Sequence, residues 1–297
     1  MQTEKTIYAL GFFDGVHLGH QALLLACSHL AQRHDCSAGV ATFTIHPDGL
    51  VSGTTPALLN TIGDRGRLLL GGGRGISKLL ELPFDKQLMD TPWEDFLLQL
   101  LSKGAAGFVC GSDFRFGAGG AGTAEKLAFF CKERNLPYAI VPQQKLDGVR
   151  VSSTYIRRLL EQGDISTANR FLGHPHTLTG KVVSGRGLGH TIGIPTANLL
   201  LPPELVTPKL GVYACKAIVD GNSYLAVTNI GSRPTVGGHQ VRVESWLLDF
   251  DGDLYGKHLC LLFYAFLRPE QKFESLEEMR REIEKNAAET RKIFENT

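Results

Sequence analysis

The chain has 297 residues, 43% of them hydrophobic and 21% charged, which is the composition of a globular protein long enough for two domains. Its formal net charge of +1 argues against a protein that binds nucleic acid through overall charge, and no apolar run is long enough to span a membrane. No signal peptide is recognisable, and the six cysteines include no Cys-x-x-Cys pair. We therefore expect reduced cysteines, a cytoplasmic location and neither nucleic-acid nor membrane partners; the sequence does not indicate an oligomeric state.

The first half of the chain alternates strand patterns with helix patterns. A helix is expected over residues 91–104, with Thr91 as its N-cap and Pro92 at its first helical position. Strands separated by helices indicate a parallel sheet covered by helices. The expected strands are residues 6–11, 36–45, 105–111 and 136–142, and the other expected helices are residues 20–32 and a segment from about Thr123.

The second half begins with two short helices within residues 152–173, separated by Gly163, with Asp164 as the cap of the second. After Gly173 the chain changes to short β-rich runs without helical patterns between them, which indicates an antiparallel barrel or sandwich. The change places a domain boundary near residue 170 and gives domains 1–170 and 171–297. The β-rich runs are residues 176–185, 211–219, 223–231, 241–250 and 258–267, and a final helix over residues 275–294 carries an apolar stripe of Leu276, Met279, Ile283 and Ala287.

The first chemical signal is the run GFFDGVHLGH over residues 11–20. It lies where a strand gives way to a helix, so unpaired backbone N–H groups and the helix dipole favour phosphate there. Gly15 permits an unusual backbone angle and Gly19 permits a ligand to approach closely. His17 and His20 share one face of the first helical turn, and their ring N–H groups can donate to phosphate oxygens. The alternatives are two surface histidines or a weak metal pair, and a zinc site would need a third ligand that is not nearby.

This run resembles the H-x-G-H motif of the nucleotidyltransferase superfamily, and its form FDGVH resembles the adenylyltransferase half of bacterial bifunctional riboflavin kinase/FAD synthetases. Three further segments match in order, namely TFTIHP (42–47), GSDFRFG (111–117) and VSSTYIR (151–157). The last resembles the superfamily's second phosphate motif, with N-capping by serine as the alternative, and His46 can be either a ligand contact or part of a turn. The resemblance implies nucleotide or flavin contacts at Gly11, Phe13, Asp14, Gly15, Gly19, His46, Asp113, Arg115, Ser152, Ser153, Thr154 and Arg157, with Asp113 favoured over Arg115.

The second chemical signal lies in residues 180–198. The glycines at 185, 187 and 189 suggest a dinucleotide fingerprint, but no helix pattern follows them. The run PTAN (195–198) resembles the metal and phosphate motif of riboflavin kinases, in which Thr196 and Asn198 would supply oxygen ligands to Mg²⁺. The match continues to residue 273 and implies Glu244 as the general base. It also implies nucleotide or flavin contacts at Gly180, Lys181, Gly185, Gly189, Pro195, Thr196, Asn198, Arg268, Glu270 and Phe273.

Two of these assignments have alternatives, because Glu244 can be an outward charge on a strand and Phe273 a core residue near the last helix. The sequence also departs from the family pattern at two places. His190 stands where arginine is usual, and GHPH (173–176) stands where GRPY is usual. Both departures concern the affinity of the kinase half for its nucleotide.

The resemblance covers nearly the whole chain and implies an α/β, Rossmann-like nucleotidyltransferase domain followed by an antiparallel β-barrel riboflavin kinase domain with a C-terminal helix. The implied activities are phosphorylation of riboflavin by ATP to FMN, and adenylyl transfer from ATP to FMN that gives FAD and pyrophosphate, with Mg²⁺ as cofactor. The rival interpretations are a flavin-binding module without catalysis and an adenylyltransferase with a non-flavin acceptor. Against the first stand the intact residues His17, His20, Thr196, Asn198 and Glu244, and against the second stands the PTAN run.

Overall fold

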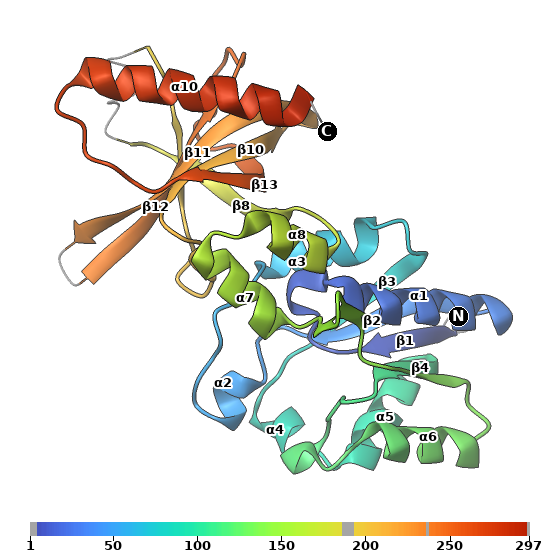
Figure 1. Ribbon diagram of the computed structural model, residues 1–297. Helices are drawn as coiled ribbons and strands as arrows, with labels where there is room; N and C mark the ends of the chain where they lie inside the picture. Colours follow the sequence, from blue (N-terminus) through green and yellow to red (C-terminus); the bar gives the residue numbers. More distant parts are fainter. Residues whose placement is uncertain (1–4, 186–192, 236–237, 296–297) are drawn as a thin grey trace. The chain divides into compact units, whose positions relative to one another are not determined.

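The computed structural model describes residues 5–185, 193–235 and 238–295, and contacts between Cα atoms divide the chain into two compact units (Figure 1). One unit contains residues 1–57 and 62–153, and the other contains residues 58–61 and 154–297. The chain therefore passes from one unit to the other three times. None of the described helices is long and apolar enough to cross a membrane.

The first unit is built on a five-stranded parallel sheet with the order β3-β2-β1-β4-β5. The central strand is buried on both faces: Ile7 and Ala9 join one apolar core with α1, whereas Tyr8 and Leu10 join another with α5 and α6. A strand between two helical layers requires apolar residues on both faces, which explains the continuous apolar run in the sequence. The strands are β1 (Thr6–Leu10), β2 (Ser37–Phe43), β3 (Ile76–Leu82), β4 (Ala105–Gly111) and β5 (Tyr138–Val141). The helical segments are η1 (Asp14–Val16), α1 (Leu18–Arg33), α2 (Asp48–Val51), α3 (Ile62–Gly71), α4 (Lys86–Met89), α5 (Trp93–Ser102), η2 (Ala118–Gly120) and α6 (Ala124–Glu133), and a small hairpin pairs β6 (Lys145–Leu146) with β7 (Val149–Arg150).

The second unit is a closed antiparallel barrel with the strand order β10-β11-β12-β9-β8-β13. Pairing of β13 with β10 closes the ring, and Tyr213 and Phe263 are fully buried within the unit. The C-terminal helix α10 packs on β10 and β11, where Ala287 joins a core with Val212 and Val227. The strands are β8 (His176–Val183), β9 (Ala197–Leu200), β10 (Gly211–Val219), β11 (Asn222–Thr235), β12 (Gly238–Leu247) and β13 (His258–Arg268), and the helices are α7 (Ser153–Gln162), α8 (Ile165–Leu172) and α10 (Leu276–Glu295).

The predicted fold class is confirmed, and the barrel is the correct choice over the sandwich. The predicted cap of α8 is also confirmed, since Asp164 Oδ1 accepts from the Thr167 N–H at 3.1 Å. The predicted cap of α5 is wrong. Pro92 occupies the N-cap position without a side-chain capping bond, because the Thr91 hydroxyl donates instead to the Gln87 carbonyl at 2.7 Å. The apolar stripe of α10 does not include Leu276, which is 54% exposed.

Residues 154–172 form most of α7 and all of α8, and their contacts group them with the barrel. Asn169 explains part of this grouping, because its side chain bonds the barrel twice. Its Nδ2 donates to the Phe263 carbonyl at 2.8 Å, and its Oδ1 accepts from the His176 N–H at 2.7 Å. The domain boundary near residue 170 remains a prediction.

Residues 58–61 also belong to the barrel unit, although they are far from it in sequence. Leu58 forms a parallel bridge with Leu205. Its N–H donates to the Glu204 carbonyl at 2.7 Å, and its carbonyl accepts from the Val206 N–H at 2.8 Å. Main-chain hydrogen bonds therefore hold this short segment to the barrel unit.

Candidate active sites

The turn between β1 and α1 has an unusual backbone. Gly15 has φ of 80°, as the sequence predicts, but Phe13 (φ 63°) and Val16 (φ 41°) also lie in the left-handed region. Both side chains are almost fully buried. A buried aromatic residue and a β-branched residue adopt such angles only where the surrounding structure enforces them, and such strain is concentrated at functional sites.

His17 and His20 lie together at the start of α1, as predicted. Their rings are stacked with centroids 3.6 Å apart and an interplanar angle of 11°. His17 is the N-cap residue, and its Nδ1 accepts from the His20 backbone N–H at 3.3 Å. A neutral imidazole that accepts at Nδ1 carries its proton on Nε2. The cap therefore fixes the His17 tautomer and makes Nε2 the donor atom of the ring.

The charge state of His20 follows from its surroundings. Burial first, and the neighbouring His17 second, hold the pKa of His20 well below its ordinary value of 6.5. The ring is therefore neutral at pH 7. Its Nδ1 is buried without a hydrogen-bond partner, and its ring also packs on Phe13 at 5.2 Å. Two stacked neutral imidazoles can donate N–H groups to an anion without repelling each other as cations.

Val151 and Ser153, at the start of the second predicted phosphate motif, lie against the first motif. The Ser153 hydroxyl donates to the Asp14 carbonyl at 2.9 Å, and the Val151 carbonyl lies 4.0 Å from the position that a Cβ at Gly19 would occupy. The same Cβ would lie 3.2 Å from the His17 ring, so a glycine is needed at position 19 for this close approach. The other predicted residues of this segment are Ser152, which is half-buried in the first unit, and Thr154 and Arg157, which lie on α7 in the second unit.

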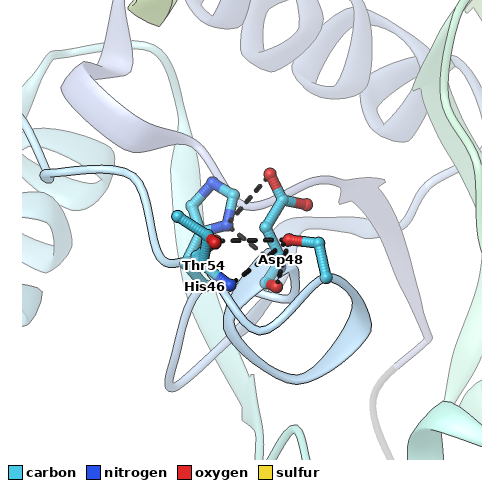
Figure 2. A network of polar contacts seen from close by, with 4 residues as sticks. His46, Asp48 and Thr54 are labelled. Carbon is cyan, nitrogen blue, oxygen red and sulfur yellow. Dashed lines mark hydrogen bonds and ion pairs between the residues drawn. The ribbon is translucent and has the colours of Figure 1, made fainter.

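His46 follows the end of β2 and belongs to a turn (Figure 2). Its Nδ1 accepts from the Asp48 N–H at 3.2 Å, so the neutral ring carries its proton on Nε2. The Asp48 carbonyl in turn accepts from the Ser52 hydroxyl at 2.9 Å, and the Thr54 N–H donates to the same hydroxyl. The imidazole also meets the Phe12 ring edge to face at 4.6 Å. His46 is therefore part of a turn, and this position is compatible with a ligand contact through Nε2.

A cavity of about 480 Å³ lies beside this turn. Pro47 and Asp48 line one side, and the predicted residue Arg115 lies on the opposite loop. Four phenylalanine rings form much of its wall, which suits a flat aromatic ligand. These are Phe43, Phe84, Phe96 and Phe116. Asp113 lies near this loop but is engaged by Arg150 in an exposed ion pair at 2.6 Å.

Two cavities meet in the barrel unit at Thr196, which lines both of them. The first, of about 350 Å³, is also lined by the predicted residue Pro195 and by residues 250–255. The second, of about 210 Å³, lies between the barrel and α10. It gathers predicted residues from distant parts of the chain, which are Thr196, Glu244, Arg268, Glu270 and Phe273.

Glu244 stands between two asparagines across the sheet. In the strand register it is opposite Asn198 on β9 and opposite Asn229 on β11, so the three side chains share one face. Asn198 is 9% exposed; its Nδ2 donates to the Thr196 carbonyl at 3.3 Å, and its Oδ1 is buried without a hydrogen-bond partner. Gly185 lies against this amide, because a Cβ there would be 2.7 Å from Asn198 Cγ.

Arg268 connects β13 to α10. Its Nε donates to Asn286 Oδ1 at 3.1 Å and lies 3.4 Å from Glu282 Oε1. Burial lowers the pKa of Arg268 from its ordinary value, and Glu282 opposes this effect. The guanidinium also lies 5.7 Å from the Phe273 ring, which lines the cavity from the segment before α10.

Not every predicted kinase residue joins these cavities. Gly180 and Lys181 lie on β8 and line neither of them, and Lys181 is exposed. Gly189 and His190 lie outside the described residues.

Several residues at these sites were missed by the sequence reasoning. Arg150 directly precedes the second phosphate motif, and Asn229 lies within a segment that already matched the family, so position alone could have indicated both. Trp246 could have been found from its spacing, since alternation along β12 places it on the same face as Glu244. Asn286 gave no such signal, because it sits in a charged helix.

Comparison with known proteins gives one consistent result for both halves of the chain. The FAD synthetase family model matches residues 1–155, and the riboflavin kinase family model matches residues 172–294. A bifunctional riboflavin kinase/FMN adenylyltransferase of Listeria monocytogenes is 34% identical over 97% of this chain and 92% of its own length. The protein of the same description from Escherichia coli strain K12 is 35% identical over 98% of this chain and 93% of its own length.

A crystal structure from Streptococcus pneumoniae, described as a macrolide-efflux protein, superposes with a TM-score of 0.87 at 28% identity, covering 98% of this chain and 95% of that one. The fold therefore agrees over both units, and the riboflavin kinase match argues against an adenylyltransferase with a non-flavin acceptor. The chain belongs to the bifunctional riboflavin kinase/FMN adenylyltransferase family: it phosphorylates riboflavin to FMN with ATP, and it transfers the adenylyl group of ATP to FMN to give FAD and pyrophosphate.

Proposed function

We propose that the two reactions have separate sites, with riboflavin phosphorylation around Glu244 in the barrel and adenylyl transfer around His17 and His20. The observation that carries this proposal is the second barrel cavity, where five predicted residues from three segments of the chain meet. The substrates are ATP, riboflavin and FMN. The cytoplasmic location and the absence of nucleic-acid partners stay predictions.

In the kinase reaction the terminal hydroxyl of the ribityl chain attacks the γ-phosphorus of ATP, and ADP leaves. Glu244 accepts the hydroxyl proton as general base. The flavin occupies the cavity beneath α10, where Trp246 and Phe273 supply aromatic surface, and the nucleotide occupies the neighbouring cavity. This assignment is supported by Thr196, because the side chain that lines both cavities stands where the two substrates must meet.

We assign Mg²⁺ in the kinase to Thr196 and Asn198. The donor set fits the ion, because hydroxyl and amide oxygens are hard ligands and Oδ1 of Asn198 is buried without a partner. When bound, the ion would neutralise charge on the transferring phosphoryl group. Asn198 lies beside Glu244 in the strand register, so the base and the proposed metal-binding oxygen face the same side of the sheet.

In adenylyl transfer a phosphate oxygen of FMN attacks the α-phosphorus of ATP, and pyrophosphate leaves. His17 and His20 donate N–H groups to the phosphate oxygens as charge develops in the transition state. The fixed tautomer of His17 and the neutral state of His20 support this role. The phosphate of FMN accepts from Nε2 of His46, and its isoalloxazine ring lies among the four phenylalanines of the adjoining cavity.

A reciprocal pair of variants tests the separation of sites. Glu244→Gln should abolish FMN formation from riboflavin and leave FMN-to-FAD conversion intact. His20→Ala should leave the kinase intact and lower kcat for FAD formation by about 10²–10³-fold, with a smaller effect on ATP binding. The untouched activity shows that the other unit is folded, and thermal melting followed by circular dichroism checks the unit that carries the substitution. Loss of both activities in either variant would contradict two separate sites, and undiminished FAD synthesis by His20→Ala would remove His20 from the catalytic role.

A further inference from the structure

Arg65 is a buried arginine at the adenylyl-transfer site that no motif contains. It lies on α3 and is only 3% exposed. Its Nη2 donates to the Phe43 carbonyl at 2.6 Å, where β2 ends, and its guanidinium carbon lies 4.3 Å above the centre of the Phe12 ring. A buried charge is unfavourable unless it is hydrogen-bonded or paired, so the position of this side chain is closely specified.

The ring beneath Arg65 also contacts His46. Phe12 receives the guanidinium on its face and meets the His46 imidazole at a centroid distance of 4.6 Å and an angle of 66°. The Phe12 backbone is fixed as well, since its carbonyl accepts from the Thr42 hydroxyl at 3.0 Å. Arg65, Phe12 and His46 come from three separate segments of the chain. The Phe12 ring contacts both of the others, so it links Arg65 to His46.

The charge of Arg65 is retained in this setting. Burial lowers the pKa of its guanidinium from its ordinary value, and the carboxylates of Asp14 and Glu81 oppose that effect. Asp14 lies in the turn before α1 and Glu81 lies near the end of β3, so the cation sits among the carboxyl ends of three parallel strands. A planar cation can stack on a ring and donate in its own plane at once, which a lysine ammonium cannot do.

We propose that Arg65 is a positioning residue for adenylyl transfer, which fixes Phe12 and through it the imidazole of His46 against the phosphate of FMN. This inference rests on the role proposed above for His46. Without the stack, the ring at position 12 can turn, and the imidazole loses the surface that limits its tilt. Small misplacements of a group that contacts the reacting phosphate cause large losses of rate.

The test is a double-mutant cycle on the full-length protein with Arg65→Met and His46→Ala, measured as kcat and KM for FMN. Arg65→Met should lower kcat/KM for FMN about tenfold or more, with KM for ATP changed less than about threefold. Because Arg65 acts through His46, the double variant should be no slower than His46→Ala alone. Arg65→Lys keeps the charge without the planar stack and should recover only part of the loss.

The matched control is Arg134→Met. Arg134 stacks on Phe130 at 3.9 Å in the same unit, but it is exposed and does not line the cavity beside His46, so its loss should leave FAD formation unchanged. Kinase rates and thermal melting report folding in every variant, and the cycle is repeated with Arg65→Lys if Arg65→Met unfolds the first unit. Normal activity of His46→Ala would overturn the His46 role and this inference together. A slow His46→Ala with multiplicative effects in the double variant would overturn this inference alone.

Discussion

The side-chain amide of Asn198 has very little room to move. Gly185 lies against it so closely that a Cβ at position 185 would come within 2.7 Å of Cγ and 2.8 Å of Oδ1. Gly185 is therefore required for steric reasons and not for an unusual φ, because its φ lies outside the left-handed region. The absence of a side chain at position 185 therefore leaves the room that the Asn198 amide occupies, and Oδ1 of this amide is the unpartnered oxygen assigned to the metal.

Gly185→Ala should displace this amide and reduce FMN formation by about 10²-fold, the usual consequence of moving a catalytic ligand by about 1 Å. FMN-to-FAD conversion by the same preparation should be unchanged. Gly180→Ala is the matched control, since a Cβ there would meet only Leu199 at 3.4 Å. The measurement is the initial rate of FMN formation over a range of Mg²⁺ concentrations. If the two alanine variants have equal rates, Gly185 does not position the Asn198 amide for catalysis.

The sequence alone was enough to identify some site residues but not others. His17 and His20 could be found because a strand, a glycine turn and a helix surround them in an uninterrupted run. Arg65 could not be found from the sequence, because GDRGR is typical of an exposed helix start. Only the fold shows that this arginine is buried against the face of the Phe12 ring. A buried cation is specified by its tertiary partners, which a local pattern does not contain.

At the scale of elements, α7 and α8 make the clearest contribution to the barrel. Ile165, Phe171 and Leu172 of α8 are each no more than 2% exposed, and Asn169 bonds the backbone of β8 and β13. Burying three such side chains contributes several kcal/mol, at about 1.5–3 kcal/mol each. The barrel should therefore depend on these helices for its stability.

Two fragments test this dependence, one of residues 154–297 and one of residues 171–297. Both should phosphorylate riboflavin when folded and make no FAD. The shorter fragment should melt at least about 8 °C lower, because it lacks the α8 contacts and a loss of 1 kcal/mol shifts the midpoint of a domain this size by about 4–8 °C. Thermal melting followed by circular dichroism gives the comparison. Equal midpoints would support the predicted boundary at residue 170 and show that the helices do not stabilise the barrel.

Two strands that were not predicted from the sequence have weak local patterns, for different reasons. The edge strand β3 is only partly buried along most of its length, so its pattern ISKLLEL alternates poorly. Strand β9 is four residues long and begins two residues after Pro195, so its sequence resembles that of a loop. The elements with long apolar runs, such as β1, β4 and β10, were all predicted, because burial on both faces leaves an unambiguous signal.

At the scale of the whole molecule, stability should depend on pH through His176. This residue is 3% exposed, packs on Phe263 and has a buried Nδ1 without a partner. Burial first, and the neighbouring His174 second, lower the pKa of His176 from 6.5 to about 3. The unfolded chain therefore binds a proton that the folded barrel excludes, and the free energy of unfolding must fall as the pH falls from 6.5 towards 3.

The expected slope from this one residue is about 1.4 kcal/mol per pH unit below pH 6. Urea unfolding at pH 7.0 and pH 5.0 measures it, in a Trp93→Phe background so that Trp246 alone reports the barrel. His176→Phe removes the titrating group while keeping an aromatic ring beside Phe263, and its stability should fall less over the same interval. Parallel losses in both proteins would show that His176 is protonated in the folded state or that other groups govern the acid response.

The path of residues 58–61 has a consequence for how this bifunctional protein can be divided. Residues 58–61 belong to the barrel unit, where Leu58 is hydrogen-bonded to Glu204 and Val206, while the segments on both sides of them belong to the other unit. The barrel unit is therefore discontinuous in sequence. Splitting the gene after codon 153 would place Leu58 and its partners on two different polypeptides, which would have to reassemble a parallel bridge as an intermolecular contact. Gene fission at any single point between residues 62 and 153 therefore separates residues 58–61 from the rest of the barrel unit.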